Sequence, residues 1–572
     1  MRCGPQAIGL VWLLASTLGS LDFLSAARAL EAPATARSMP EPELPPDIDD
    51  AAPLAAIALP SSAAPAAATH GRDVSLAPEM SDPEVGAPPL PPGATPNDIA
   101  DALEALPPAD GKRSPLSALP NWRASRDALT AFYAGRANIP IWTDASGFNG
   151  AGKAVIARLA RAEADGLDLS ELSIPAPGAR MKNPALLARA EVALGQAVLA
   201  YAFQASGGRI DPARISPMIT AKAAVVDPAR ALSIVATAAD PDTALAGLNP
   251  PQKGYRELRE ELALVRAALG DSGPSADDAE AAKLQSSGEP GALARSRFGA
   301  DGRGRRMALR AQASDVTLTA AEADLDRGAP GTSASRALEA NILANMEMWR
   351  WEPRDMGEER IEVNVADFTL RVLRGEETLL NTRIIVGKPE WQTPIFSNSM
   401  RYILVNPSWR VPPSIIRKEM LPKLAEDPDY LTRQGFEVVQ KGDTIEVRQP
   451  PGERNALGRI AFMFPNEHSV YLHDTPSREL FMASRRAFSH GCVRVDQPMR
   501  LAELVMGGNW SEQRLRSLIG GAERTIFLPR PLPIHIEYFT AFVDDAGTLQ
   551  TRGDVYGHMQ RVESALGLLR KI

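Results

Sequence analysis

The spacing of apolar residues changes once along the chain, and this change limits what the chain can fold into. Between 119 and 270, segments such as "GKAVIARLARAEADG" place apolar residues at i, i+3, i+4 and i+7, which predicts amphipathic helices. Further on, "RIEVNVADFTLRVLRG" alternates apolar and polar residues, which predicts two strands joined near Ala366 and Asp367. The sequence therefore predicts a multidomain α+β protein, with a helical domain at 119–270 and a strand-rich, β-sandwich-like domain at 346–545.

Other segments show neither the helical nor the strand pattern of apolar residues, or they interrupt one of these patterns. Residues 30–118 are rich in Ala, Pro, Ser and acidic residues, so we expect a disordered tether that cannot bury enough apolar surface to fold. Residues 271–345 lose the helical pattern and are expected to form a linker or a degenerate insertion. A helical insertion at 414–434 is a candidate lid, or else a plain surface helix. Residues 546–572 are expected to form a helical tail.

The first residues carry the features of a secretory signal. Arg2 supplies a positive charge, 7–18 form an apolar run too short for a membrane span, and Ala27-Arg28-Ala29 has the small-x-small cleavage pattern. We expect a signal peptide at 1–29, with an uncleaved anchor as the alternative. Both place the rest of the chain outside the cytoplasm. The net charge of −8 argues against a nucleic-acid partner.

Cleavage would leave Cys492 as the single cysteine, because the chain contains two and the other is Cys3. A lone cysteine in an exported protein cannot form an internal disulfide, and free thiols are a liability in oxidising compartments. It is then either a small buried hydrophobe or a reactive group. Its neighbours in "AFSHGCVRVDQP" favour the second interpretation.

Residues near Cys492 could make it a nucleophile. A cysteine needs a base or a positive neighbour to form thiolate, and His473, at the end of the apparent strand "SVYLH", is the candidate base. Gly491 permits a tight turn that would expose the N–H groups of Gly491 and Cys492 to an oxyanion. Ser489 could orient a histidine, and Arg494 adds positive charge.

Alternative roles remain for these histidines and for the nearby aromatic residues. His473, His490 and Cys492 could offer three ligands to zinc, although nothing in the spacing completes a closed site. His70, His468, His535 and His558 are expected to have no catalytic role. Trp391, Tyr402 and Trp409 could line a cleft or belong to the core.

The stretch "HDTPSRELFMASRRAFSHGCVRV" resembles the signature of the L,D-transpeptidases of the YkuD type: a histidine, a spacer, then Ser-His-Gly-Cys and a nearby arginine. The resemblance extends from about 350 to 560 and includes "VGKPEWQTPIF" and "NPSWRVPPSI". In the helical part, "IPIWTDASG" and "GGRIDP" are similar to the scaffold of the large periplasmic subgroup of these enzymes.

This resemblance implies a role for each matching residue. Cys492 would be the nucleophile and His473 its general base, while His490 and Gly491, supported by Ser489, would shape the oxyanion hole. Arg494 would correspond to a structurally important arginine. The reaction would be acyl transfer from a peptidoglycan tetrapeptide to an amine, with release of D-alanine and formation of 3→3 cross-links or protein–wall bonds.

The resemblance also implies partners and a location. These are peptidoglycan stem peptides as donors, outer-membrane proteins among the acyl acceptors, carbapenems as inhibitors, and the periplasm of a Gram-negative type of envelope. No cofactor or metal is required, because a thioester conserves the acyl reactivity. A carboxypeptidase that uses water as acceptor, and a non-catalytic wall-binding scaffold, are the alternative functions.

Overall fold

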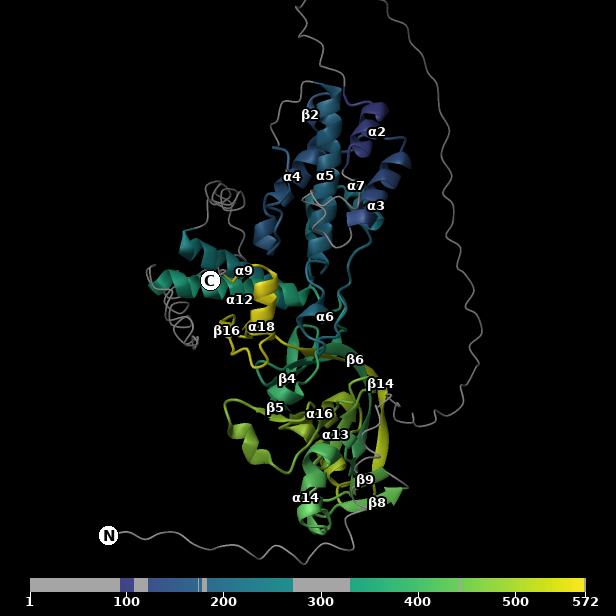
Figure 1. Cartoon of the computed structure of the whole chain (residues 1–572), viewed down its shortest axis with the longest axis vertical. Helices are drawn as coiled ribbons and strands as arrows, with labels where there is room; N and C mark the ends of the chain where they lie inside the picture. The colour runs from purple at the N-terminus through teal and green to yellow at the C-terminus, as the bar shows by residue number, and fades with distance from the viewer. Residues whose placement is uncertain are drawn as a thin grey trace, which may run out of the picture. The chain divides into compact units, whose positions relative to one another are not determined.

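The structure, a computed structural model, describes residues 93–106, 122–172, 174–176, 183–270, 330–441 and 444–569 (Figure 1). The predicted signal peptide and most of the predicted tether lie outside the described residues, as do residues 271–329. The rest confirms the predicted fold class: a helical domain precedes a sheet domain. One buried apolar cluster lies in the helical domain, and a second joins the sheet to α6 and α9 of the helical domain.

The helical domain is organised by one long apolar helix, α5 (Pro184–Ala205). The Asn183 side chain accepts from Leu186 N–H and Pro184 occupies the first turn, so the helix start is well defined. Helices α2, α3, α4 and α7 pack around α5, as Figure 1 shows. Length and composition alone would let α5 cross a membrane, but most of its window is buried inside the protein. It is therefore the core helix of this domain.

The remaining elements of the helical domain are short helices and one two-residue strand pair. They are α2 (Pro96–Glu104), α3 (Trp122–Ala134), β1 (Thr143–Asp144), β2 (Gly147–Phe148), α4 (Gly150–Leu159), η2 (Ala162–Asp165), α6 (Pro212–Ile215), α7 (Pro228–Thr237), α8 (Pro241–Ala246) and α9 (Lys253–Leu269).

Helix α2 corrects the prediction of a disordered tether over 30–118. It begins with a capping box, in which Thr95 and Asp98 each satisfy the other's backbone N–H. Its apolar side chains Ile99 and Leu103 are buried, and α2 packs on α5. Two apolar residues at helical spacing are enough here because a neighbouring helix already offers an apolar face.

Helix α12 (Pro330–Trp349) corrects the assignment of 271–345 as a linker. It packs beside α9, and Leu338 and Ile342 enter the same buried cluster as the sheet domain. The composition before 330 is loop-like, whereas the helical period resumes at "ALEANILANMEMW", so the true change of texture falls inside the predicted linker.

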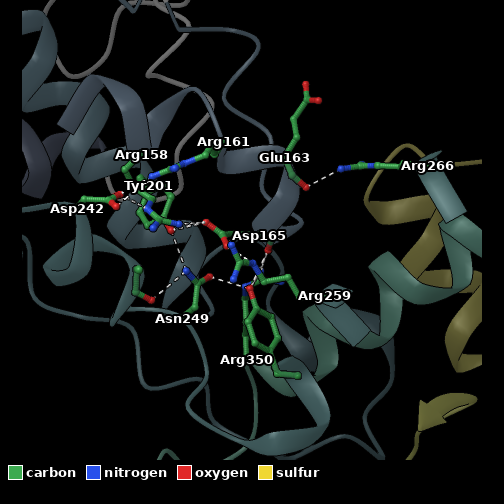
Figure 2. Close-up of polar contacts among 12 residues, drawn as sticks. Arg158, Arg161, Glu163, Asp165, Tyr201, Asp242, Asn249, Arg259, Arg266 and Arg350 are labelled. Carbon is green, nitrogen blue, oxygen red and sulfur yellow. Dashed lines mark hydrogen bonds and ion pairs between the residues drawn. The ribbon is translucent and has the colours of Figure 1, made fainter. Parts of the chain in front are cut away.

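A buried polar network connects the helical domain to the end of α12 (Figure 2). The Asp165 carboxylate accepts a hydrogen bond from Tyr201 at 2.7 Å and forms an ion pair with Arg259 at 2.8 Å. Its backbone carbonyl accepts from Tyr255 at 2.8 Å and from Arg350, just after α12, at 2.5 Å. Asp165 and Arg350 are buried, so neither is hydrated. Hydrogen bonds and ion pairs within the network must therefore replace their contacts with water.

The sheet domain contains a nine-stranded sheet that closes on itself. Its strand order is β12-β5-β13-β11-β10-β6-β14-β3-β4, and β4 also pairs with β5. Residues alternate between an apolar inner face and a polar outer face: in β3, for example, Ile361 and Val363 are fully buried while Arg360 and Glu362 are not. The predicted strand pair around Ala366 and Asp367 is confirmed as β3 and β4.

The nine strands are β3 (Glu359–Asn364), β4 (Thr369–Arg374), β5 (Glu377–Gly387), β6 (Phe396–Val405), β10 (Ile460–Met463), β11 (Leu472–His473), β12 (Ala487–Ser489), β13 (Val493–Val495) and β14 (Arg524–Glu537). The connecting elements are η3 (Pro389–Trp391), β7 (Trp409–Arg410), α13 (Pro413–Ile415), the π-helix η4 (Ile416–Met420), α14 (Leu421–Glu426), α15 (Tyr430–Arg433), β8 (Glu437–Lys441), β9 (Thr444–Gln449), η5 (Arg478–Met482), α16 (Pro498–Met506), α17 (Glu512–Arg516), β15 (Ala541–Val543), β16 (Leu549–Thr551) and α18 (His558–Ala565).

The predicted insertion at 414–434 is helical, and it is built from α13, η4, α14 and α15. Strands β8 and β9 form a hairpin that pairs with β7 in a separate three-stranded sheet. At the other end of the domain, β15 pairs with β16 across the predicted boundary at 545, so the sheet domain extends past it. The helical tail is correct only for α18.

The buried network predicts which carboxylate stabilises the helical domain. We expect Asp165→Ala to lower the free energy of unfolding by about 3–5 kcal/mol, because it leaves buried cationic and hydroxyl groups without their partner. The matched control is Asp168→Asn, since this side chain is half exposed and its ion pair with Arg209 spans 3.6 Å. It should cost about 1 kcal/mol or less. Urea denaturation of both variants is the measurement, and equal costs would contradict a buried network.

Candidate functional site

The candidate site is organised by the parallel pairing of β11 with β13. His473 lies opposite Arg494, and Leu472 lies opposite Val493. Side chains alternate along a strand, so Cys492 and Arg494 share a face, and so do Tyr471 and His473. The register places all four on the outer face of the sheet, with Cys492 beside Tyr471 and diagonal to His473.

His473 is a buried, neutral imidazole. Burial, together with the nearby Arg494 cation, lowers its pKa to about 3, and the hydrogen bond to the Asp474 carbonyl opposes this shift. Nδ1 lies 2.5 Å from the backbone oxygen of Asp474. A carbonyl can only accept, so Nδ1 carries the proton, and Nε2 is the nitrogen that can take up another.

The Cys492 thiol is partly exposed and is a neutral thiol rather than a thiolate. Burial raises its pKa to about 11, although hydrogen bonds from the Tyr471 backbone and side chain, and the charge of Arg494, favour the ionised form. Thiol and imidazole are therefore both uncharged at neutral pH. Such a pair can react only by moving the proton as the sulfur attacks.

The turn that carries Cys492 has a left-handed backbone at Gly491, with φ of 112°. Ser489 holds the turn: its hydroxyl donates to the Cys492 carbonyl at 2.5 Å and accepts from the Gly491 N–H at 3.1 Å. In this structure Ser489 therefore bonds to the turn, and the Gly491 N–H bonds to Ser489. The expected roles of Ser489 and Gly491 at an oxyanion hole stay predictions.

Two residues that support this turn were not found from the sequence. The buried Thr393 hydroxyl donates to the Gly491 carbonyl at 2.8 Å and accepts from the Gly387 N–H at 2.9 Å. Tyr556 donates to the Gly387 carbonyl at 2.6 Å and accepts from the Thr393 N–H at 3.2 Å. They lie about 100 residues before and 65 residues after Gly491 in sequence, and no local motif marks either one.

His490 faces the helical insertion at 413–433, the candidate lid. Its Nε2 lies 2.5 Å from the carboxylate of Glu419, in η4, and its ring packs edge-on against Trp391. Lys418 of the same π-helix lies over the Trp391 ring, 4.4 Å from its centroid. The predicted role of His490 in the oxyanion hole stays untested, whereas the contact with Glu419 is a feature that the sequence did not reveal.

Trp409 and Tyr402, two of the three aromatic residues that could line a cleft, are placed differently from each other. Trp409 packs against Phe436, with ring centroids 6.1 Å apart, and its side chain lies near that of Tyr471. Tyr402 pairs with Met463, and the β10–β11 register continues that row toward Tyr471. Tyr402 therefore lies on the same sheet face as Cys492 but on a more distant strand, where it packs against the exposed ring of Phe527.

Three other histidines have structural contacts, whereas His70 lies outside the described residues. His535 is buried between Ser397 and the Met356 carbonyl, and His558 is buried in the C-terminal part. The His468 side chain is mostly buried, with Nε2 3.0 Å from the Thr220 hydroxyl. Within the described residues no three side chains of His, Cys, Asp or Glu gather as a metal site would need, and this includes the three proposed as zinc ligands.

A thiol, a neutral imidazole and an arginine on one sheet face form the kind of site that cysteine acyltransferases use. Residues 358–516 match the YkuD family model, described as the L,D-transpeptidase catalytic domain, and residues 127–262 match a Scaffold domain. The sheet domain thus matches an L,D-transpeptidase catalytic domain, and most of the helical domain matches a Scaffold domain.

Individual relatives agree with this assignment over part of their length. A Haemophilus influenzae protein, provisionally named an L,D-transpeptidase, is 30% identical over 224 residues, or 36% of this chain and 45% of that protein. The chain thus spans less than half of this relative.

Solved structures that resemble the chain are also L,D-transpeptidases. One from Mycobacterium smegmatis is 15% identical, covering 32% of this chain and 58% of its own, with a TM-score of 0.18. L,D-transpeptidase 3 from Mycobacterium tuberculosis, solved with a faropenem-derived adduct, is 10% identical, covering 32% and 60%, with a TM-score of 0.18. TM-scores this low carry no argument of their own.

The raised pKa of Cys492 makes a direct prediction about its reactivity. Alkylation by iodoacetamide should accelerate about tenfold per pH unit between pH 7 and 10, because the thiolate fraction grows in that proportion below a pKa of about 11. Intact-protein mass after timed quenching gives the rate, and Cys492→Ala is the control. A rate that levels off below pH 8 would mean that the free enzyme holds a stabilised thiolate.

Proposed function

We propose that this chain is a peptidoglycan L,D-transpeptidase in which Cys492 is the nucleophile and His473 the general base. The observation that carries the proposal is the neutral His473 ring, with Nδ1 bound to the Asp474 carbonyl, on the same sheet face as the Cys492 thiol. Its Nε2 can accept the thiol proton only while the ring is neutral.

In the first step, the Cys492 sulfur attacks the carbonyl of the donor tetrapeptide while its proton moves to His473 Nε2. The tetrahedral oxyanion then collapses, the bond to D-alanine breaks, and the proton passes from His473 to the leaving amine. A thioester on Cys492 remains. Arg494, whose buried Nε has no hydrogen-bond partner, provides positive charge beside both reacting groups and can stabilise the developing negative charge.

In the second step, an acceptor amine attacks the thioester and transfers its proton to His473. The carbon–sulfur bond breaks, and the sulfur recovers the proton as the thiol. The acceptor is an amine of a second stem peptide, which gives a 3→3 cross-link, or of an outer-membrane protein. We place this chemistry in the periplasm, on the signal-like residues 1–29.

The acylation step predicts what the donor leaves on the protein. With a disaccharide-tetrapeptide donor, the intact protein should gain the mass of the acyl group as D-alanine is released, and cross-linked dimer should form. Cys492→Ala should form no adduct, and His473→Gln should slow acylation by about 10²–10⁴ because it removes the proton acceptor. Carbapenems should acylate the same sulfur. Intact-protein mass and muropeptide analysis are the measurements.

The products separate this function from the alternatives. Adduct and D-alanine followed only by tripeptide would show a carboxypeptidase. A folded protein that forms no adduct and binds wall fragments would be the non-catalytic scaffold.

One observation favours transfer to an amine over hydrolysis. The lid lies against the Cys492 turn through the Glu419–His490 contact and the Lys418–Trp391 contact. A π-helix such as η4 often marks a functional site. A lid fixed at these two points would restrict the access of water to the thioester and so favour a bound amine as acceptor.

Breaking the Glu419 contact should therefore change the partition of the thioester. We expect Glu419→Ala to raise the ratio of hydrolysis to transfer several-fold with little change in acylation rate, because the lid loses one of its two attachments. Glu426→Gln, which changes an exposed carboxylate of the same insertion, is the control. The ratio of tripeptide to dimer measures the effect, and an unchanged ratio would remove the lid from the mechanism.

A further inference from the structure

The structure contains a cavity of about 380 Å³ that none of the proposed chemistry uses. It lies on the outer face of the sheet over β3, β4 and the end of β14, beside the start of α9 and the end of α12. Around the closed sheet, β5 separates these strands from β13 on one side, and β6 and β10 separate them from β11 on the other. The lining includes none of the residues placed in the Cys492 site.

The floor of the cavity contains a buried carboxyl group, one oxygen of which has no hydrogen-bond partner. Glu537 is 3% exposed, and its Oε1 has no hydrogen bond. Burial raises the pKa of Glu537 well above its ordinary value, as do the nearby carboxylates of Glu362 and Glu352, while Arg360 and Arg371 oppose the shift. Burial thus favours the uncharged form in the free protein, and a bound ammonium group would fill the unused Oε1 and stabilise the charged form.

An aromatic wall stands beside this carboxylate. Trp349 lines the cavity and stacks on Phe539, with ring centroids 4.3 Å apart. The indole Nε1–H of Trp349 is also buried without an acceptor. The cavity thus presents one hydrogen-bond acceptor, on Glu537, and one donor, on Trp349, that have no partner. In a purely structural contact both groups would be expected to be hydrogen-bonded.

The rim of the cavity carries the start of helix α9 together with side chains of both signs. Helix α9 has 17 residues, and its N-cap residue Gln252 makes no side-chain hydrogen bond to the first turn. Lys253 and Arg256 line the cavity, are about half exposed, and form ion pairs with Glu257 at 3.7 Å and Glu376 at 3.4 Å, two carboxylates of the same lining. Free N–H groups of a helix start favour a carboxylate, and half-exposed ion pairs are weak enough to exchange partners with it.

We propose that this cavity is a second binding site, which takes a zwitterionic amino acid or short peptide. The ligand's ammonium group contacts Glu537 and its carboxylate lies at the start of α9, while Trp349 packs on the body of the ligand and donates its N–H. The volume is at the lower end of the range for ligand pockets, which suits one to three amino-acid residues.

Two sources share this chemistry: a free amino acid such as the released D-alanine, and a peptidoglycan stem peptide. The stem as a source rests on the proposed function, whereas the charge arrangement of the cavity does not. A site of this kind would hold a wall peptide, or retain a product, away from the reacting sulfur.

The experiment is calorimetric titration of the full-length Cys492→Ala variant, which cannot acylate, with D-alanine, the free tetrapeptide and the disaccharide-tetrapeptide. At least one should bind at a site that Glu537→Gln weakens about 10- to 100-fold, the range for a lost charged hydrogen bond. N-acetylation of that probe should weaken the same binding at least tenfold.

Matched variants keep the test interpretable. Glu377→Gln, which changes an exposed carboxylate of β5 outside the cavity, should leave affinity unchanged. Lys253→Glu should weaken binding through the exposed rim, and it tests the proposal even if Glu537→Gln fails to fold. Affinities unaltered by Glu537→Gln and Lys253→Glu, or no binding of any probe, would overturn the site. Because Cys492→Ala has no chemistry, neither result depends on whether the proposed transfer occurs.

Discussion

The site depends on a pairing of only two residues in β11 with two in β13. This parallel contact sets the thiol-bearing turn beside His473 and Arg494, although 19 residues separate the histidine from the cysteine. The pairing is held from outside, because β13 also pairs with β5 and β11 with β10, both within a closed sheet. A short contact can therefore be rigid when its neighbours leave it no alternative register.

Sequence predicted the parts of this protein that depend on local pattern. The change of apolar period gave the two domains, and the strand pair around Ala366 followed from alternation alone. Helix α2 is the exception. Its capping box, Thr95 with Asp98, marks a helix start, but the Ala- and Pro-rich composition around it is typical of disorder. In that case a precise local signal was more informative than an average over 90 residues.

The missed site residues are of another kind. Thr393, Tyr556 and Glu419 act on the turn at Gly491 from loops and helices far away in the sequence, and each is an ordinary residue in an ordinary local context. Only the folded sheet brings the Gly387 end of β5 under that turn. The nucleophile and base could be inferred from residue type and spacing. The residues that hold them in place could be identified only from their positions in the folded protein.

The charge state of the site allows a lone thiol to be unreactive at rest and still attack a bound substrate. With a pKa of about 11 for Cys492 and about 3 for His473, almost no thiolate exists near pH 7 in the free protein. Oxidation and disulfide exchange both begin from thiolate, so the resting site is protected in the oxidising compartment where we propose that it works. Reactivity then appears only when a bound carbonyl allows proton transfer and carbon–sulfur bond formation to proceed together. A site with a permanent ion pair would react faster with any electrophile, and the neutral pair gains selectivity for a substrate that the cleft holds in position.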